Sequence, residues 1–198
     1  MTPQEARAVY AAGAEVLDLP RAPLARVEDL HLPGGDGQPR PARLYASTAA
    51  TSGSPCPVLL YFHGGGFVLG GLDTHDSLCR QLALRSGGAV LALDYRLAPE
   101  HPFPAAWDDA WAALRWLVDE GAEHGLDTHR IAVGGDSAGG TLAAATALRA
   151  RDAGLPLALQ LLITPGTSDR ADTGSRRLFG QGFLIDSATV TWFFNLSL

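Results

Sequence analysis

The fold is most constrained by residues 130–140, which read Arg-Ile-Ala-Val-Gly-Gly-Asp-Ser-Ala-Gly-Gly. A short apolar run over 131–133 meets two glycines, and the small residues that follow Ser137 favour a helix packed closely against a sheet. We expect a strand, a sharp turn and a helix, with the serine at the apex. Residues 135–139 fit the G-x-S-x-G elbow, which holds a nucleophilic serine above the edge of a sheet.

The glycines on both sides of Ser137 have a steric explanation. The turn is strained, and a Cβ atom beside the serine would collide with the adjoining strand and helix. The strain holds the hydroxyl at the N-terminus of a helix whose dipole favours developing negative charge. Taken alone, the motif also fits an ordinary glycine-rich turn with an incidental serine, because short motifs match by chance.

A second motif follows the apolar, β-prone run over 58–62 and reads His-Gly-Gly-Gly-Phe over 63–67. Acyl-transfer enzymes of this architecture need backbone N–H donors opposite the nucleophile, and a His-Gly-Gly-Gly loop after the third strand supplies them. Taken alone, the loop also fits a tight turn, with or without a phosphate. We assign the oxyanion hole to N–H groups among Gly64, Gly65 and Gly66, joined by that of Ala138.

Together the two motifs resemble the hormone-sensitive-lipase-like branch of the α/β-hydrolases, also called GDXG esterases, with His63 and Asp136 as supporting residues. Residues 94–105, Asp-Tyr-Arg-Leu-Ala-Pro-Glu-His-Pro-Phe-Pro-Ala, are similar to an internal signature of that family. The resemblance covers about 26–195. It implies an α/β-hydrolase fold: a mostly parallel central sheet with helices on both faces and a partial cap. It further implies a carboxylic-ester hydrolase with Ser137 as the catalytic nucleophile, no cofactor and no metal.

The composition limits the classes of partner. With 198 residues, 46% of them hydrophobic, the chain is long enough for one domain with a sizeable core. The net charge of -6 argues against a nucleic-acid or anionic-membrane partner. Cys56 and Cys79 have no metal-binding spacing, which favours a reduced, cytoplasmic protein. Residues 1–16 lack the apolar core of a signal peptide, and no run reaches the length of a membrane span. We expect a small-molecule ester as the partner.

The predicted elements alternate as in a mostly parallel sheet with crossover helices. Thr2 caps an amphipathic helix that ends near Leu17. An antiparallel hairpin opens the sheet, and a polar loop over 48–57 follows it. The residues after Pro165 are expected to form a loop through Arg177. Strands are expected at 26–32, 42–46, 58–62, 89–93, 131–133 and 157–163, and helices at 73–85, 107–118, 141–150 and 187–194.

Two segments, 1–25 and 165–198, are expected to form the cap-like parts of a single domain over 1–198. The first helix equally fits a surface helix with no role in substrate binding. In the resembling family the second segment lines the acyl pocket, although core packing explains its apolar side chains as well. The candidate pocket residues are Phe179, Phe183, Leu184, Trp192 and Phe193.

Two upstream histidines are interpreted as structural. His75 and Asp76 lie at the start of a predicted helix, where capping and local hydrogen bonding explain them better than a metal or catalytic pair. His101 lies between Pro99 and Pro102 and is interpreted as fixing that loop.

The order of residues conflicts with a complete catalytic triad. In this fold the serine is followed by an Asp or Glu and then by a His. Asp169, Asp172 and Asp186 follow Ser137 but match no acid motif of the family. All the histidines precede the serine: His31, His63, His75, His101, His124 and His129.

We therefore expect a chain that is incomplete at its C-terminus and lacks the last strands of the fold, the catalytic acid and the base. A serine hydroxyl without a base is a weak nucleophile. The apolar strand at 157–163 is then an uncovered sheet edge, which favours association with another copy of the chain.

Other functions remain open beside the esterase. One is a non-catalytic remnant that binds a small ligand or a protein on the same scaffold. Another is an esterase whose base is an upstream histidine, such as His63 or His101, or comes from a partner chain. A nucleotide-binding protein is set aside, since the elbow does not contain G-x-G-x-x-G and the chain has no P-loop motif.

Overall fold

The structure is a computed structural model of the chain, and it describes residues 1–47, 55–168, 170 and 172–198. Most of the predicted polar loop over 48–57 lies outside the described residues, as does Asp169. The last two residues of that predicted loop, Cys56 and Pro57, instead begin a strand.

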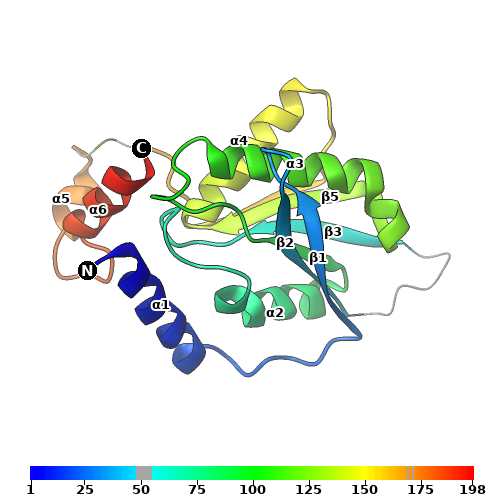
Figure 1. Cartoon of the computed structure of the whole chain (residues 1–198), viewed down its shortest axis with the longest axis horizontal. Helices are drawn as coiled ribbons and strands as arrows, with labels where there is room; N and C mark the ends of the chain where they lie inside the picture. The colour runs from blue at the N-terminus through cyan, green and yellow to red at the C-terminus, as the bar shows by residue number, and fades with distance from the viewer. Residues whose placement is uncertain (48–54, 169, 171) are drawn as a thin grey trace.

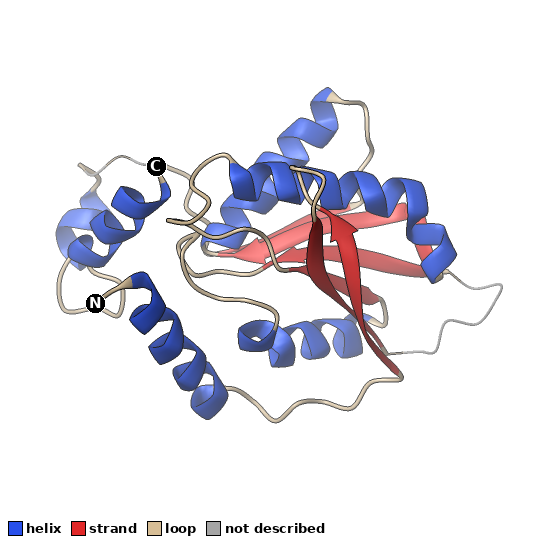
Figure 2. Ribbon diagram, viewed as in Figure 1, coloured by secondary structure: helices blue, strands red, loops and turns tan. Residues whose placement is uncertain are grey.

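A six-stranded sheet forms the centre of the fold, in the order β1-β2-β4-β3-β5-β6 (Figure 2). The first two strands form the predicted antiparallel hairpin, and β2 also pairs antiparallel with β4. The remaining pairs, β4 with β3, β3 with β5 and β5 with β6, are parallel. The mostly parallel sheet is therefore confirmed. The strands are β1 (Arg26–Pro33), β2 (Pro39–Ala46), β3 (Cys56–Phe62), β4 (Ala89–Leu93), β5 (Leu126–Asp136) and β6 (Leu159–Ile163).

Helices cover both faces of the sheet (Figure 1). One face carries α2 (Asp76–Ser86), which continues a short 3-10 helix, η1 (Asp73–His75). The other face carries α3 (Ala105–Glu120), which leads into η2 (Gly121–His124), and α4 (Ala138–Asp152). Strand β4 shows the result: Leu91 and Leu93 pack into the core under α3 and α4, whereas Val90 and Ala92 pack against α2. A strand covered on both faces has no polar side, which explains its unbroken apolar sequence.

The register of the parallel strands determines where the two glycine motifs meet. Phe62, at the end of β3, pairs with Gly135 near the end of β5. Asp136 pairs with Ile163 at the end of β6. Because parallel strands end at the same edge of a sheet, the loop after Phe62 and the turn after Asp136 emerge side by side.

Helices α1 (Pro3–Leu17) and α6 (Ser187–Ser197), with the two chain termini, lie at one end of the molecule (Figure 1). Helix α1 begins with the predicted Thr2 cap, completed by Glu5 as a capping box. Its Arg7 donates to the carbonyl oxygens of Val68 and Ala98, both at 2.8 Å, which attaches α1 to the loops beyond β3 and β4. Ala6 of α1 forms a small apolar cluster with Val68 and Ala98. At the other end of the chain, α6 packs against this cluster through Trp192, Phe193 and Leu196.

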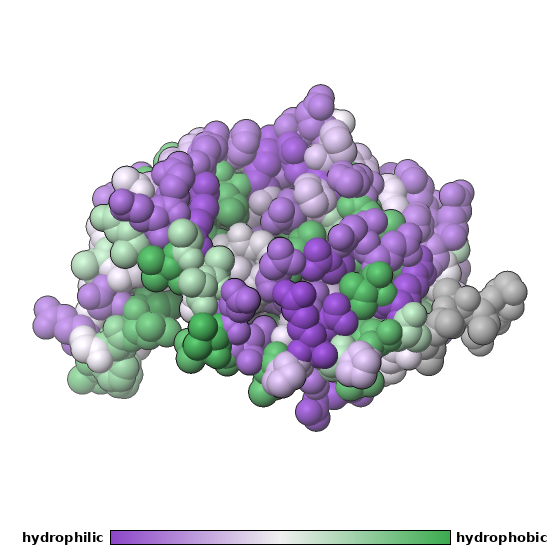
Figure 3. Space-filling model, turned by 60° about the horizontal axis from the view of Figure 1, so that its bottom comes forward, coloured by the Kyte–Doolittle hydropathy of each residue, from purple (hydrophilic) through white to green (hydrophobic). Residues whose placement is uncertain are grey.

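Apolar side chains are exposed in these segments. Figure 3 shows hydrophobic surface gathered at the end of the molecule that carries α1 and the C-terminal helices. The exposed residues there include Val9, Val16, Leu17, Leu178, Phe179, Phe183, Leu184 and Ile185.

Most element boundaries shift from the sequence prediction by one to three residues, and two differences are larger. Strand β5 begins at Leu126 rather than at residue 131, because Leu126 pairs with Cys56 of β3 although the intervening residues are polar. The predicted loop through Arg177 contains a short helix, α5 (Gly174–Phe179). Thr173 caps it by accepting a hydrogen bond from the Arg176 N–H.

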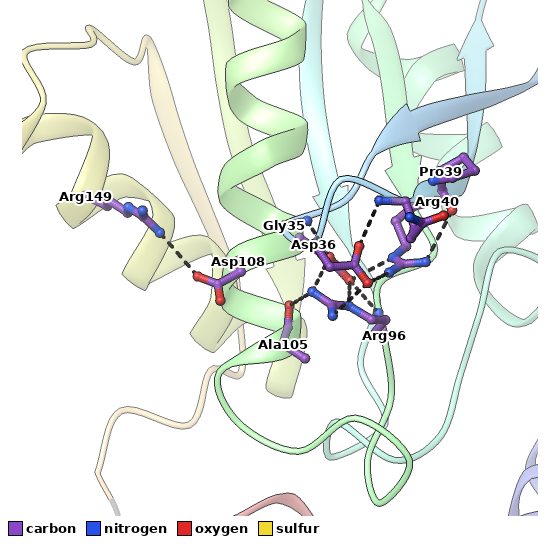
Figure 4. A network of polar contacts seen from close by, with 10 residues as sticks. Gly35, Asp36, Pro39, Arg40, Arg96, Ala105, Asp108 and Arg149 are labelled. Atoms are coloured by element: carbon purple, nitrogen blue, oxygen red, sulfur yellow. Dashed lines mark hydrogen bonds and ion pairs between the residues drawn. The ribbon is translucent and has the colours of Figure 1, made fainter.

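A polar network joins the opening hairpin to α3 and to the segment after β4, and Gly35, Arg96 and Ala105 belong to it (Figure 4). Asp109 is 0% exposed and accepts hydrogen bonds from the Arg96 side chain at 2.8 and 2.9 Å. It also accepts the Gly35 N–H at 2.8 Å. Burial acts to raise the pKa of Asp109, but these hydrogen bonds outweigh it and the pKa lies below its usual value.

Candidate active site

Ser137 forms the turn between β5 and α4, where it is the N-cap residue of the helix. Its backbone has φ 50° and ψ −118°, a conformation that non-glycine residues adopt only when the surroundings enforce it. One enforcing contact is the hydrogen bond from the Ser137 N–H to the Ile163 carbonyl oxygen, at 2.8 Å. The structure thus contains the expected strand, turn and helix, with the serine at the apex.

The glycines beside Ser137 are required by the close approach of β3. A Cβ atom on Gly135 or Gly139 would overlap the carbonyl oxygen of Phe62. On Gly135 it would also meet the backbone of Gly139 in α4. The steric explanation predicted from the sequence is therefore confirmed, since both a strand and a helix exclude a side chain here.

The loop after β3 reverses direction at its glycines. Gly65 has φ 121° and Gly66 has φ 62°. The Gly65 carbonyl oxygen accepts the N–H groups of Val68 and Leu69, at 3.1 and 2.8 Å, which closes the loop on itself. Within the described part of the chain, the N–H groups of Gly65 and Gly66 have no hydrogen-bond acceptor. The Ala138 N–H begins α4 and has no acceptor inside the helix.

Asp136 connects the serine turn to the glycine loop. Its Oδ1 accepts the Gly64 N–H at 2.9 Å and the Tyr61 hydroxyl at 2.7 Å. The Nε2 of His75 lies 3.3 Å from the same oxygen. Burial acts to raise the pKa of Asp136, but the contacts with His75, Tyr61 and Gly64 outweigh it and the pKa lies below its usual value. The carboxyl group is therefore ionised, accepts from Tyr61 and Gly64, and faces the His75 ring.

His63 supports the loop from below. Its ring is 3% exposed and stacks on Tyr95 with 4.3 Å between ring centroids. The Tyr95 hydroxyl donates to the His63 carbonyl oxygen at 2.7 Å, and Nδ1 of His63 lies 2.8 Å from the Gly64 carbonyl oxygen. Burial, followed by the nearby His75, lowers the pKa of His63 to about 4. The ring is neutral at pH 7 and orients the glycine loop.

The interpretation of His75 and Asp76 from the sequence is confirmed in part: both make local hydrogen bonds, but neither caps a helix. Neither side chain caps α2 locally: His75 makes no capping hydrogen bond and reaches the Asp136 carboxylate instead. Asp76 is 1% exposed and accepts hydrogen bonds from the Tyr45 hydroxyl at 3.0 Å and from Arg80 at 2.6 Å. Each side chain also reaches another element, His75 to Asp136 of β5 and Asp76 to Tyr45 of β2, because the start of α2 is buried under the sheet.

The remaining acidic and histidine candidates lie away from Ser137. Asp172 accepts from Arg170 at 2.9 Å, and Asp186 caps α6 by accepting the Thr189 N–H at 2.7 Å. The His101 side chain is exposed, and only its backbone N–H is bonded, to the Leu97 carbonyl oxygen. In the described part of the chain, no histidine makes a hydrogen bond to the Ser137 hydroxyl.

The candidate pocket residues of the second cap-like segment divide into two groups. Phe193 packs on the glycine loop, since a Cβ atom on Gly66 would overlap its ring. Trp192 contacts the Phe193 ring with 5.2 Å between centroids. Phe179, Phe183 and Leu184 are more than half exposed, with no contact to the glycine loop among the described residues. A role in an acyl pocket stays a prediction for all five residues.

Three residues at the site were not predicted: Tyr61, His75 and Tyr95. For Tyr61 a signal was present, because it is a polar hydroxyl in an otherwise apolar strand, two residues before the glycine loop. Tyr95 lies inside the 94–105 signature, but nothing local indicates that it contacts His63 or that His75 reaches Asp136, because those partners lie on other elements.

Neither a metal-binding group nor a membrane-spanning helix is found among the described residues. The described residues contain no group of three or more His, Cys, Asp or Glu arranged to hold a metal ion. Among the same residues, no helix is long and apolar enough to cross a membrane.

Comparison with known proteins agrees with this geometry. Residues 59–198 match the family model described as alpha/beta hydrolase fold. Esterase LipI of Mycobacterium tuberculosis is 54% identical over 154 residues, which are 76% of this chain and 48% of LipI. Ethyl acetate hydrolase of Pseudomonas putida is 42% identical over 170 residues, which are 85% of this chain and 54% of that protein.

Solved structures show the same arrangement. The ester-hydrolase EH1AB1 from the metagenome of Lake Arreo, solved with a derivative of bipyridine phosphonate, has a TM-score of 0.94 and 38% sequence identity. The alignment covers 100% of this chain and 62% of that one. The chain spans about half the length of the curated relatives it matches. On its motifs, its sheet topology and these similarities, the chain belongs to the α/β-hydrolase fold family, in the hormone-sensitive-lipase-like branch.

Proposed function

We propose that the protein is a serine carboxylic-ester hydrolase that acts on small or short-acyl esters. The observation that carries this proposal is the strained backbone of Ser137, held at the N-terminus of α4 beside a glycine loop. Strained backbone of this kind clusters at functional sites. It can hold a reactive side chain in an orientation that an unstrained backbone would not allow. The names of the relatives, esterase and ethyl acetate hydrolase, support the same reaction and small substrates.

In the proposed reaction, the Ser137 Oγ gives up its proton and attacks the ester carbonyl carbon, the carbon–oxygen bond to the alcohol breaks, and the alcohol leaves with a proton. Water then hydrolyses the acyl-serine to the carboxylic acid and restores the hydroxyl. The carbonyl oxygen becomes negatively charged in the transition state and needs N–H donors. We assign these donors to Gly65, Gly66 and Ala138. Gly64 leaves the predicted set, because its N–H is already bonded to Asp136.

We further propose that the segments 1–25 and 165–198 form a cap over this site. Arg7 attaches the first segment to the loop beyond Gly66, and Phe193 of the second segment packs on Gly66 itself. A ring at that position limits the space beside the oxyanion donors, which fits small acyl groups.

The proposal includes the expectation that the catalytic acid and base are absent from this chain. All six histidines precede Ser137 in the sequence, and none is bonded to its hydroxyl in the described part of the structure. Loss of the base in a serine hydrolase lowers turnover on the order of a million-fold. The oxyanion hole and substrate binding still leave roughly a thousand-fold acceleration over water.

The test is hydrolysis of p-nitrophenyl acetate and butyrate by the purified chain and by Ser137→Ala. A fluorophosphonate label followed by mass spectrometry locates the nucleophile. We expect slow turnover that depends on Ser137, and a label on Ser137. Fast, serine-dependent turnover would show that a base is present after all. Equal rates for both proteins without a label would contradict the esterase and favour the binding module.

Two smaller proposals concern the setting of the protein. Cys56 and Cys79 are both free thiols, which supports a reducing compartment such as the cytoplasm. Strand β6 pairs only with β5 among the described residues, and its Leu159 is exposed. We propose that copies of the chain associate through this edge. Sedimentation velocity over a concentration series tests this, and a monomer at all concentrations would contradict it.

A further inference from the structure

We propose that His75 is a positioning residue that holds the glycine loop at the distance Ser137 requires, acting through Asp136. The inference rests on the proposed function for its kinetic consequence, but its geometric part stands on the contacts alone. The sequence predicted capping and local hydrogen bonding for His75; the structure has the local contact with Thr74 but no capping bond.

The ring of His75 is oriented by partners on both nitrogens. Nδ1 lies 2.9 Å from the Thr74 hydroxyl oxygen, and Nε2 lies 3.3 Å from Oδ1 of Asp136. The Thr74 hydroxyl has one proton and donates it to the Gly71 carbonyl oxygen at 2.9 Å. The ionised Asp136 carboxylate is an acceptor only, so the His75 Nε2 that faces it carries a ring proton.

The Asp136 oxygen that His75 contacts is the one that fixes the glycine loop. Oδ1 accepts the Gly64 N–H, and the next two residues carry the proposed oxyanion donors. Tyr61 alone would hold the carboxylate at a single point, whereas His75 approaches from another element and adds a second. Two donors from β3 and the start of α2 restrict rotation of the carboxylate and keep Oδ1 directed at Gly64.

The expected kinetic effect follows from the precision that the reaction needs. A displacement of about 1 Å in catalytic groups costs roughly a hundred-fold in rate. Without His75, the Gly64 hydrogen bond weakens and the loop that follows it moves more freely. The loss should fall on kcat, because the oxyanion donors act in the transition state.

A packing role and a donor role predict different variants. The His75 ring is 8% exposed and lies 5.5 Å from the His63 ring and 6.5 Å from the Tyr61 ring, centroid to centroid. If packing is what matters, His75→Phe retains it. If the hydrogen bond to Asp136 matters, His75→Gln retains it, since the glutamine amide nitrogen reaches the place of Nε2.

The experiment compares His75→Phe, His75→Gln and the control Ser77→Ala. Ser77 lies in the same first turn of α2 and is also buried, but it donates to the Leu19 carbonyl oxygen and does not contact Asp136. Hydrogen–deuterium exchange of the Gly64 amide is followed by NMR. The kcat and KM for p-nitrophenyl acetate are measured on the same samples.

We expect exchange of the Gly64 amide about tenfold faster in His75→Phe, as for the loss of one hydrogen bond. In that variant kcat should fall by about tenfold to a hundred-fold with little change in KM. His75→Gln and Ser77→Ala should stay within about threefold of the original chain in both readouts, a difference smaller than one hydrogen bond. Equal behaviour of the Phe and Gln variants, or an unchanged Gly64 amide in His75→Phe, would overturn the inference. If the original chain shows no Ser137-dependent turnover, the esterase proposal fails, and the amide exchange still decides the role of His75.

Discussion

The N–H of Gly64 donates to Oδ1 of Asp136 across 2.9 Å, and this bond joins the loop after β3 to the turn that carries Ser137. The two residues belong to different sequence motifs, and each motif reads as a separate half of an esterase site. Their direct contact explains why Gly64 has no side chain, since a Cβ atom there would overlap the Asp136 carboxylate. It also assigns Asp136 to holding the site together.

Removing the Asp136 carboxylate should therefore damage both stability and activity. In Asp136→Ala, the Gly64 N–H and the Tyr61 hydroxyl lose their acceptor, and each unsatisfied buried donor costs about 1–3 kcal/mol. We expect the free energy of unfolding in urea to fall by about 2–4 kcal/mol. Asp172→Ala is the control, because that exposed carboxylate pairs only with a neighbouring arginine, and it should change stability by less than about 0.5 kcal/mol. Equal effects would contradict the bracing role of Asp136.

A methyl group on Gly139 should be poorly tolerated. Its Cβ atom would overlap the Phe62 carbonyl oxygen, a backbone atom in the centre of the sheet that cannot move aside. We expect Gly139→Ala to lower the free energy of unfolding by about 3 kcal/mol. The matched control is Gly13→Ala in α1, where no atom lies within 4 Å of the new Cβ. There the same substitution should raise stability by about 0.5–1 kcal/mol through helix propensity.

Shortening Phe193 should change acyl preference if the proposed esterase is correct. The ring packs on Gly66, so Phe193→Ala opens space beside the proposed oxyanion donors. We expect the ratio of kcat/KM for p-nitrophenyl butyrate over acetate to rise by about tenfold, the scale of one or two methylene contacts. Phe194→Ala, at the partly exposed neighbouring position, is the control and should leave the ratio unchanged. A ratio unaffected by both variants would place the acyl group elsewhere.

Breaking the Asp109 network should cost far more than breaking a nearby surface pair (Figure 4). Asp109 is fully buried, and Asp109→Ala removes the acceptor of the Gly35 N–H and of two hydrogen bonds from the Arg96 guanidinium. Removal of one partner of a buried pair costs about 3–5 kcal/mol. Asp108→Ala, one residue earlier on α3, breaks only a half-exposed contact with Arg149 at 3.7 Å. That control should lose less than about 1 kcal/mol in the same thermal or urea unfolding measurement.

The features of the protein that depend on local chemistry can be predicted from its amino-acid sequence alone. The run over 89–93 predicts β4 at its observed bounds, because a strand covered on both faces must be apolar throughout. Thr2 and Pro3 predict the start of α1 because the signals are local. Thr2 caps the helix by accepting from Glu5, three positions later, and Pro3 suits the first helical position. The elbow at Ser137 and the glycine loop could likewise be predicted, because a tight turn with no room for a side chain requires glycine, and glycines are visible in the sequence.

Which of these elements are in contact depends on the tertiary structure and could not be predicted from the local sequence. Asp136 and Gly64 are 72 positions apart, and no pattern along the chain indicates that the Gly64 N–H donates to the Asp136 carboxylate. His75 reads as a capping residue until the fold buries the start of α2 beside Asp136. Strand β5 extends back to Leu126 over polar residues because β3 lies alongside to pair with it. The local sequence determines helix and strand propensity and the positions where only glycine fits. The hydrogen-bond partners of buried polar groups depend on which elements the packed fold brings close together.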